Sequence, residues 1–233
     1  MIGVVVPAHN EAACLAGCLR SLVAASTHPE LSGEAVRIVV VLDGCTDLSA
    51  TIAAQFPVIS LASSACNVGK ARAAGAQAML DVGARWLAFT DADSVVSERW
   101  LVDQLALSSD AVCGTVVVDD WSDYALEVQR VYDAHYCQLD GHRHIHGANL
   151  GVSADAYRRV GGFEPLKAHE DVALVRALER AGAQIAWSAK PVVRTSARCN
   201  GRAPEGFAGY LRALQRQVQS VAECLDYAPN VNP

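Results

Sequence analysis

Two aspartates separated by a single residue, Asp91 and Asp93, directly follow the apolar run 86–90. Carboxylate oxygens suit hard divalent cations such as Mg2+ and Mn2+, which are commonly held by one or two carboxylates plus the phosphates of a substrate. The pair therefore indicates a metal and phosphate site at the end of a strand. A turn that caps the next helix is the alternative, because Asp93 followed by Ser94 could also begin a helix.

A second polar group, Asn67, Gly69, Lys70 and Arg72, stands at the start of a predicted helix over 70–82. Free backbone N–H groups and the helix dipole attract anions at a helix start, and the two cations add positive charge. We expect a diphosphate to fit here, with an ordinary loop-to-helix turn as the alternative. The glycine patterns of dinucleotide enzymes and of P-loop nucleotide hydrolases are absent.

Glu170 and Asp171 precede an apolar helical stripe and so fall in the first turn of a predicted helix over 170–181. A carboxylate in that position could remove a proton from an attacking hydroxyl, which requires one oxygen within hydrogen-bond reach of it. A pair of acidic residues that only stabilises the helix dipole is the alternative.

The histidines give a further candidate site. His142, His144 and His146 alternate, so in an extended chain they would project to one face, as transition-metal ligands do. A loop over the molecule that carries the attacking hydroxyl explains the segment as simply. His169, next to Glu170, is a candidate contact for that molecule or for a metal, with an exposed loop histidine as the alternative.

The elements that must position these residues alternate between strand and helix. The short apolar, β-branched runs 2–6, 36–42, 58–61 and 86–90 predict strands buried on both faces of a parallel sheet. Between them we expect a first helix that contains Cys14 and Leu22, capped by Asn10 and begun by Glu11, and then helices over 47–55 and 70–82. This order is typical of a doubly wound sheet, in which ligands bind beyond the carboxyl ends of the strands.

The second half of the chain is less regular, but it shows no repeat and no clear linker. We predict one α/β domain over 1–226, made of two halves over about 1–95 and about 96–226, and a loose tail over 227–233. The remaining predicted helices are 98–108, 123–138, 154–160, 170–181 and 207–225, and the remaining strands are 111–118, 148–152, 184–188 and 192–195.

Composition excludes several function classes. The chain has 233 residues and a formal net charge of −6, so it lacks the positive field that binding to nucleic acid usually needs. No apolar run approaches the length of a membrane span and no leader pattern precedes the first strand, so we expect a soluble, cytoplasmic protein. The 8 cysteines include no C-x-x-C pair that would suggest a zinc site or redox motif, and a chain of this size does not need a disulfide framework.

Taken in order, a series of motifs across about 2–195 resembles the inverting glycosyltransferases of family 2, which have the GT-A fold. Each motif is weak alone, and their order and spacing make the match specific. The motifs are Val4-Val-Val-Pro-Ala-His-Asn-Glu11, Leu42-Asp-Gly-Cys-Thr-Asp47, Asn67-Val-Gly-Lys-Ala-Arg-Ala73, Asp91-Ala-Asp93, Gly147-Ala-Asn149, Val160-Gly-Gly-Phe-Glu164 and Glu170-Asp-Val-Ala-Leu174.

The resemblance implies transfer of a sugar from a nucleotide donor, usually UDP-linked, to an acceptor hydroxyl with inversion, assisted by Mn2+ or Mg2+. It makes the half over about 1–95 the nucleotide-binding half and the half over about 96–226 the acceptor half. It makes Asp171 the general base beside Glu170, and Asp93 with Asp91 the metal ligands. Three residues are implied near the acceptor or donor sugar: Gly147, Asn149 and His169. The implied donor-nucleotide contacts are Pro7, Ala8, Asn10, Glu11, Asp43, Asn67, Gly69, Lys70, Arg72, Asp91 and Ala92.

The sequence also departs from the family pattern. Many relatives carry a metal-binding histidine in the stretch that here reads Val192-Val-Arg-Thr-Ser196, so Arg194, Arg198 or Arg202 could stabilise the diphosphate instead. The Q-x-x-R-W motif of processive synthases is absent, which favours a single addition. The sugar, the acceptor, which could be lipid-linked, and the oligomeric state are left open.

Two other classes of protein remain as alternatives. The first is a nucleotide-sugar-binding or scaffold protein that keeps the fold without turnover. The second is a sugar-1-phosphate nucleotidyltransferase, which should carry a glycine-rich loop where this chain reads Pro7-Ala-His-Asn-Glu11. We expect the final helix to pack on the core, with a membrane surface or a second subunit as the alternatives.

Overall fold

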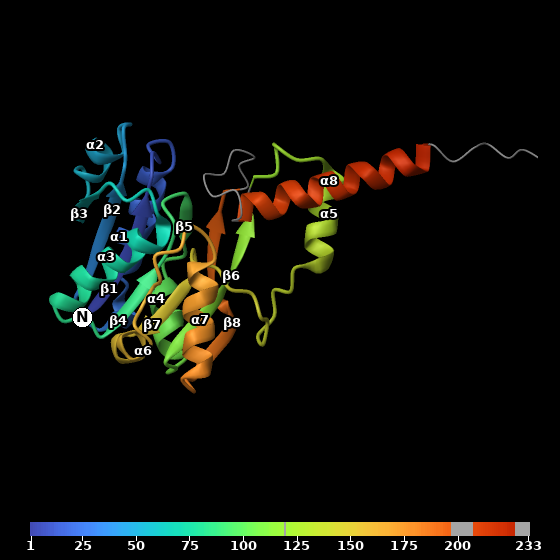
Figure 1. Cartoon of the computed structure of the whole chain (residues 1–233). Coiled ribbons are helices and arrows are strands. Elements are labelled where there is room, and N and C mark those ends of the chain that lie inside the picture. Colours follow the sequence, from blue (N-terminus) through green and yellow to red (C-terminus); the bar gives the residue numbers. More distant parts are fainter. Residues whose placement is uncertain (119, 197–206, 227–233) are drawn as a thin grey trace, which may run out of the picture. The chain divides into compact units, whose positions relative to one another are not determined.

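The computed structural model describes residues 1–118, 120–196 and 207–226, with side chains given for 209–219 in the last segment. The chain forms two compact units (Figure 1). The first unit comprises Met1–Val117 and Gln138–Thr195, and it contains the motifs singled out above. The second comprises Val118–Cys137 and Ser196–Pro233. The predicted tail over 227–233 lies outside the described residues.

An eight-stranded sheet in the order β3-β2-β1-β4-β7-β6-β8-β5 forms the centre of the first unit. β1 pairs in parallel with β2 and with β4, and β2 pairs in parallel with β3, whereas β7 runs antiparallel to β4 and β6. The predicted mostly parallel α/β sheet is confirmed. The strands are β1 Ile2–Ala8, β2 Val36–Asp43, β3 Ile59–Ser63, β4 Trp86–Phe89, β5 Ser94–Val96, β6 Ala111–Val118, β7 Leu150–Ser153 and β8 Ile185–Thr195.

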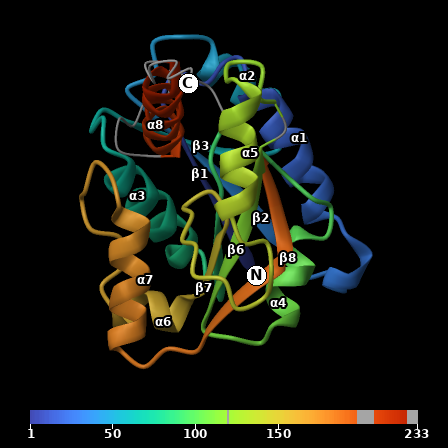
Figure 2. The ribbon, with the colours of Figure 1, turned by 90° about the vertical axis from the view of Figure 1, so that its right-hand side faces the viewer.

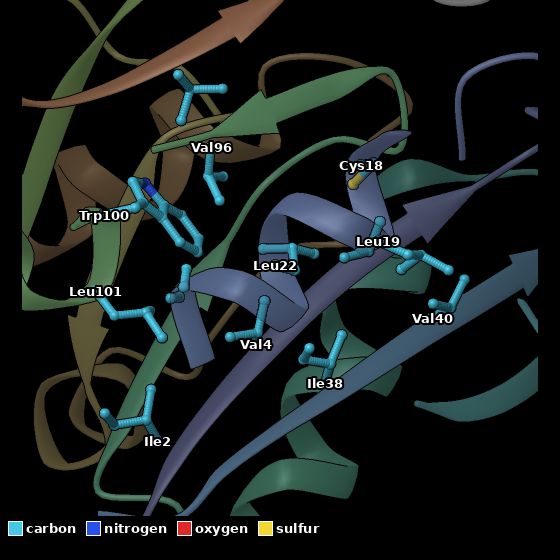
Figure 3. Close-up of a cluster of buried hydrophobic side chains, with 14 of the residues drawn as sticks. Ile2, Val4, Cys18, Leu19, Leu22, Ile38, Val40, Val96, Trp100 and Leu101 are labelled. Atoms are coloured by element: carbon cyan, nitrogen blue, oxygen red, sulfur yellow. The ribbon is translucent and has the colours of Figure 1, made fainter. Parts of the chain in front are cut away.

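Both faces of the sheet are covered by helices, which explains the continuous apolar character of its strands. Alternate residues of β1 point to opposite faces: Val4 and Val6 join the cluster beneath α1, and Val5 joins the cluster beneath α3. Figure 3 shows the first cluster, in which Leu22 of α1 lies next to Val4 of β1 and Leu19 lies next to Val40 of β2.

Figure 2 shows the helices of the two faces on either side of the sheet. One face carries α1 (Leu15–Ser26), α2 (Ser49–Ala53) and α4 (Trp100–Ala106), together with the 3-10 turn Pro29–Leu31. The other face carries α3 (Val68–Asp81), α6 (Ala154–Arg159) and α7 (Glu170–Arg180).

Several sequence-based boundaries are wrong. α1 begins at Leu15 with no acidic residue in its first turn, so Asn10 does not cap it and Glu11 does not begin it. Asp93 and Ser94 do not start a helix, because Ser94 opens the short strand β5, which pairs with the far end of β8. The two predicted strands over 184–188 and 192–195 are one strand, β8, which continues through Pro191.

The second unit is built around α5 (Leu126–His135) and α8 (Phe207–Asp226). Leu211 and Leu214 of α8 pack with Val128 and Tyr132 of α5, so the final helix buries its apolar side against another helix. Within the described part of the chain, no helix combines the length and the apolar character that crossing a membrane requires.

Candidate active site

The loops that follow β1 and β2 are tied together by hydrogen bonds. Asn10 Oδ1 accepts hydrogen bonds from the backbone N–H of Thr46 (2.7 Å) and of Asp47 (3.3 Å). The backbone N–H of Glu11 donates to Ser49 Oγ at 2.9 Å. Asn10 has a positive φ of 56°, a conformation that asparagine adopts more readily than most residues. The loops after β1 and β2 form one rim of the sheet, and Asn10 fixes the shape of this rim rather than capping a helix.

Asp43, at the end of β2, is buried and holds three donors. Its carboxylate accepts hydrogen bonds from Ser63 Oγ (2.7 Å) and from the backbone N–H groups of Cys66 (3.0 Å) and Asn67 (2.7 Å). Desolvation acts to raise the pKa of Asp43, but these hydrogen bonds outweigh it and hold the pKa below its usual value. The residue is thus a charged anchor for the loop at the predicted nucleoside position.

Asn67 and Gly69 attach the start of α3 to the segment that leads to α7. Asn67 Oδ1 caps the helix by accepting from the Lys70 N–H (2.8 Å), and Asn67 Nδ2 donates to the Pro165 carbonyl (3.0 Å). The Gly69 N–H donates to the Leu166 carbonyl at 3.1 Å. Of the predicted anion-binding group at this helix start, only Lys70 has an exposed side chain.

The predicted metal pair lies in a tight turn between β4 and β5. The Ser94 N–H donates to the Asp91 carbonyl (3.1 Å), and Ala92 between the two aspartates is buried. Asp91 and Asp93 are both partly exposed. Desolvation is the largest influence on Asp91 and, with the like charge of Asp93, raises its pKa, while Arg72 acts in the opposite direction.

Arg72 of α3 is 3% exposed and ion-paired on two sides. Its Nη2 lies 2.5 Å from Asp91 Oδ1, and its Nη1 pairs with Glu170 Oε1. Burial would lower the pKa of Arg72, but the nearby carboxylates raise it above the ordinary value, so the guanidinium keeps its charge. Burial also raises the pKa of Glu170.

The predicted base, Asp171, lies in the first turn of α7 and is partly exposed. Its Oδ2 accepts a hydrogen bond from the Gly147 N–H (2.7 Å), and its Oδ1 accepts one from the Val172 N–H (2.8 Å). Both oxygens are thereby oriented, and each retains acceptor capacity. His169, two residues before Asp171, is exposed and has a positive φ of 60°.

The other predicted sugar and diphosphate contacts fall in different places. Asn149 is fully buried, so it is not exposed to a ligand. Pro7 is partly exposed and Ala8 is buried at the end of β1, and Arg194 is exposed on β8. Arg198 and Arg202 lie outside the described residues.

The three alternating histidines stack on one another, as their spacing predicts. The ring centroids of His142 and His144 lie 5.4 Å apart, and those of His144 and His146 lie 6.0 Å apart. The buried His142 Nε2 contacts the Ser188 carbonyl (3.2 Å), and its Nδ1 accepts from the His144 N–H (3.2 Å). Both ring nitrogens of His142 therefore have protein partners, which favours a packing role.

The donor set of the Asp91-Asp93 turn fits Mg2+ or Mn2+. Asp91 gives Oδ1 to Arg72, which leaves Oδ2 for an ion, and the side chain of Asp91 is 37% exposed. In the segments that the structure describes, no cluster of three or more histidine, cysteine or acidic side chains could hold a metal. Two carboxylates suffice for these ions when substrate phosphates supply further ligands.

Two serines that support the rim were not among the predicted site residues. Ser63 donates to Asp43, and Ser49 accepts from the Glu11 N–H. Ser63 ends β3, so the rule that selected residues after the other parallel strands would have found it. Ser49 gives no local signal, because its role depends on the loop after β1.

Comparison with known families identifies the class. The model of the family described as "Glycosyl transferase family 2" matches residues 3–149, which include the rim, the Asp91-Asp93 turn and Gly147. The chain belongs to glycosyltransferase family 2, a class of enzymes, and it has the GT-A fold. No protein of curated function shows significant sequence similarity to it.

Three solved structures with similar folds contain bound nucleotides or nucleotide-sugars. Residues 1–349 of TarS from S. aureus, in complex with UDP, share 17% identity with a TM-score of 0.63 over 84% of this chain and 60% of that one. The mannosyltransferase PcManGT from Pyrobaculum calidifontis, in complex with GDP-Man and Mn2+, shares 15% identity with a TM-score of 0.62, over 98% of this chain and 65% of that one. GalNAc-T7 with UDP, GalNAc and Mn2+ shares 15% identity with a TM-score of 0.65, over 88% of this chain and 45% of that one.

Proposed function

We propose that the protein transfers a sugar from a nucleotide-diphospho-sugar to an acceptor hydroxyl with inversion, in a single addition. The observation that carries this is the arrangement around Arg72. Its guanidinium pairs with Asp91 of the metal-binding turn and with Glu170, the neighbour in sequence of the partly exposed Asp171. Arg72 thus connects the proposed donor site, through Asp91, with the start of the helix that carries the proposed base, through Glu170.

UDP is the proposed nucleotide. TarS is known in complexes with UDP and with UDP-GlcNAc, and GalNAc-T7 in a complex with UDP. The buried Asp43 and the loop that Asn10 fixes would form the nucleoside end of the site. The exposed Lys70 supplies positive charge beside it. Because PcManGT is known with GDP-Man, the nucleotide must be tested directly.

Asp91 and Asp93 would hold the divalent cation. When bound there, Mn2+ or Mg2+ supplies positive charge that stabilises the departing nucleoside diphosphate. PcManGT and GalNAc-T7 are both known with Mn2+, and the two carboxylates present here suit such an ion.

Asp171 is the proposed general base. Its carboxylate accepts the proton of the acceptor hydroxyl while the oxygen of that hydroxyl forms a bond to the anomeric carbon. The bond between that carbon and the diphosphate breaks on the opposite face, so the configuration inverts. The two backbone N–H groups that bind the Asp171 oxygens orient the carboxylate before the acceptor arrives. The acceptor is a hydroxyl compound, with lipid-linked saccharides among those to be tested.

The experiment compares two variants with a matched control. Asp171→Asn keeps the shape of the side chain but removes its basicity, so we expect UDP release from UDP-sugars to fall by roughly 1,000-fold or more while UDP binding is retained. Asp93→Ala should weaken the Mn2+-dependent stabilisation by UDP in a thermal-shift assay. Asp81→Asn is the control, because Asp81 is an exposed aspartate of α3 whose carboxylate accepts a hydrogen bond from Gln77.

The nucleotide is identified with UDP, GDP, CDP and dTDP, each with and without Mn2+. A Mn2+-dependent shift with UDP alone supports the proposal, and a selective shift with another nucleotide replaces UDP as the donor. If no nucleotide shifts the wild type, the donor site is wrong. If the wild type binds UDP but never releases it from a UDP-sugar, the protein binds nucleotide-sugars without turnover.

A further inference from the structure

Arg72 connects two segments that are distant in sequence. One terminal nitrogen of its guanidinium pairs with Asp91, 19 residues along the chain, and the other pairs with Glu170, 98 residues along. The side chains of Arg72 and Glu170 are each 4% exposed. Because both ends of the guanidinium fork are engaged inside the protein, Arg72 is fixed between the two carboxylates.

Gly147 lies directly against this guanidinium. A Cβ atom at Gly147 would overlap the Nη1, Cζ and Nη2 atoms of Arg72, so any other residue at this position would displace the guanidinium. The N–H of the same residue donates to Asp171 Oδ2 at 2.7 Å. Gly147 therefore contacts both the arginine that holds Asp91 and the carboxylate proposed as the base.

The remaining surroundings of the guanidinium leave it little freedom. Arg72 Cζ lies 5.8 Å from the centroid of the Phe163 ring, close enough for a cation–π contact. Arg72 Nε is buried and has no hydrogen-bond partner among the described residues. Lysine could not replace this arginine, because a single ammonium group lacks the planar fork that reaches two carboxylates at once.

We infer that Arg72 is a positioning residue, held in place by Gly147, that sets Asp91 for the metal and fixes the first turn of α7 that carries Asp171. This inference rests on the proposed function and deepens it, because it makes the donor side and the acceptor side parts of one rigid unit. It also replaces the expectation that Arg72 contacts the diphosphate directly, since both of its terminal nitrogens already have carboxylate partners.

The test separates the binding of metal from the binding of nucleotide in Arg72→Lys. The affinity for Mn2+ is measured at saturating UDP by titration, and the affinity for UDP is measured without metal. Arg85→Lys is the matched control, because Arg85 also pairs with a glutamate, Glu34, through two nitrogens, at 2.7 and 2.5 Å. Arg85 precedes β4, at the opposite end of that strand from Asp91.

In Arg72→Lys we expect the Mn2+ affinity to fall by about tenfold or more, as when other residues that orient metal ligands are replaced. The metal-free UDP affinity should change by less than about threefold, since the displaced group is Asp91 and not the nucleotide. Arg85→Lys should leave both affinities unchanged. A loss of tenfold or more in metal-free UDP affinity would instead show direct diphosphate contact and would overturn the inference, as would an unchanged Mn2+ affinity.

Gly147→Ala provides a second, independent test and decides the matter if Arg72→Lys does not fold. It keeps every charge but displaces the guanidinium, so it should lower Mn2+ affinity and also slow UDP release from UDP-sugars. Mn2+ affinity and release rate equal to those of the wild type would contradict the inference. A wild type that binds neither Mn2+ nor UDP would overturn the proposed function and this inference with it, so the two failures are distinguishable.

Discussion

Replacing Asn149 by alanine should destabilise the protein strongly without acting on a ligand. The side chain is fully buried. Its Oδ1 accepts a hydrogen bond from Trp100 Nε1 (2.9 Å), and its Nδ2 donates to the carbonyls of Thr115 (2.7 Å) and Pro191 (2.6 Å). Asn149 therefore joins α4, β6 and β8 from its position just before β7, and no solvent can take over these contacts.

The size of the stability loss follows from the polar groups that lose their hydrogen-bond partner. Asn149→Ala leaves one indole N–H and two carbonyls without these partners in the core, at about 1–3 kcal/mol each. Because each carbonyl has a second lone pair, the lower part of that range applies to them. The free energy of unfolding should fall by about 3–5 kcal/mol, which for a chain of this size lowers Tm by roughly 10 °C.

The assay is urea unfolding together with a thermal melt. The control is Thr90→Val, because Thr90 Oγ1 is buried without a partner among the described residues, so its loss should leave stability unchanged or slightly higher. The resemblance alone implies that Asn149 contacts a sugar. If Asn149→Ala melts within about 1 °C of the wild type but binds UDP-sugars more weakly, the reasoning from burial is refuted.

Three further changes should alter stability in a known direction. Gly69→Ala should lower the free energy of unfolding by about 1–3 kcal/mol, because the new Cβ would overlap the Glu164 carbonyl oxygen. Gly17→Ala in α1 should raise it by about 0.5–1 kcal/mol, because a Cβ there meets nothing within 4 Å. Urea unfolding measures both changes. Burial lowers the pKa of His146 to about 4 from 6.5, so the unfolded chain binds the proton more readily between these values. Stability should therefore fall by up to about 3 kcal/mol as the pH drops through that range, and equal pH dependence in His146→Gln would contradict this.

Much of the fold was predictable because local patterns carried it. The β-branched runs that became β1 and β2 are continuous, as strands covered on both faces must be. The rim was predictable as well, since the ends of parallel strands meet at one edge of a sheet. Asp43 is the last residue of β2 and Asp91 comes two residues after the end of β4, so their place along the chain predicted their place in the fold.

The parts that were not predictable depend on contacts between distant segments. The pattern around Arg72 resembles a solvated helix start. The Arg72 side chain is buried because Glu170 and Gly147, which are distant in sequence, pack against it. Asn149 occupies a motif position that implies a ligand contact, whereas its partners are Trp100 and carbonyls of β6 and β8. β5 is three residues long, and its pairing with β8 leaves no local signature.

The path of the chain from β4 to β5 bends the sheet. In the strand order, β5 lies four places from β4, a span of roughly 19 Å across a flat sheet. The chain from Phe89 to Ser94 could stretch at most about 18 Å, and the hydrogen bond from the Ser94 N–H to the Asp91 carbonyl (3.1 Å) shortens it further. The sheet must therefore curl, which brings its edge strand β5 close to the end of β4 in the middle of the strand order. The Asp91-Asp93 turn connects these two strands. Separating β5 from β8 would therefore pull directly on the Asp91-Asp93 turn, where we propose that the cation binds.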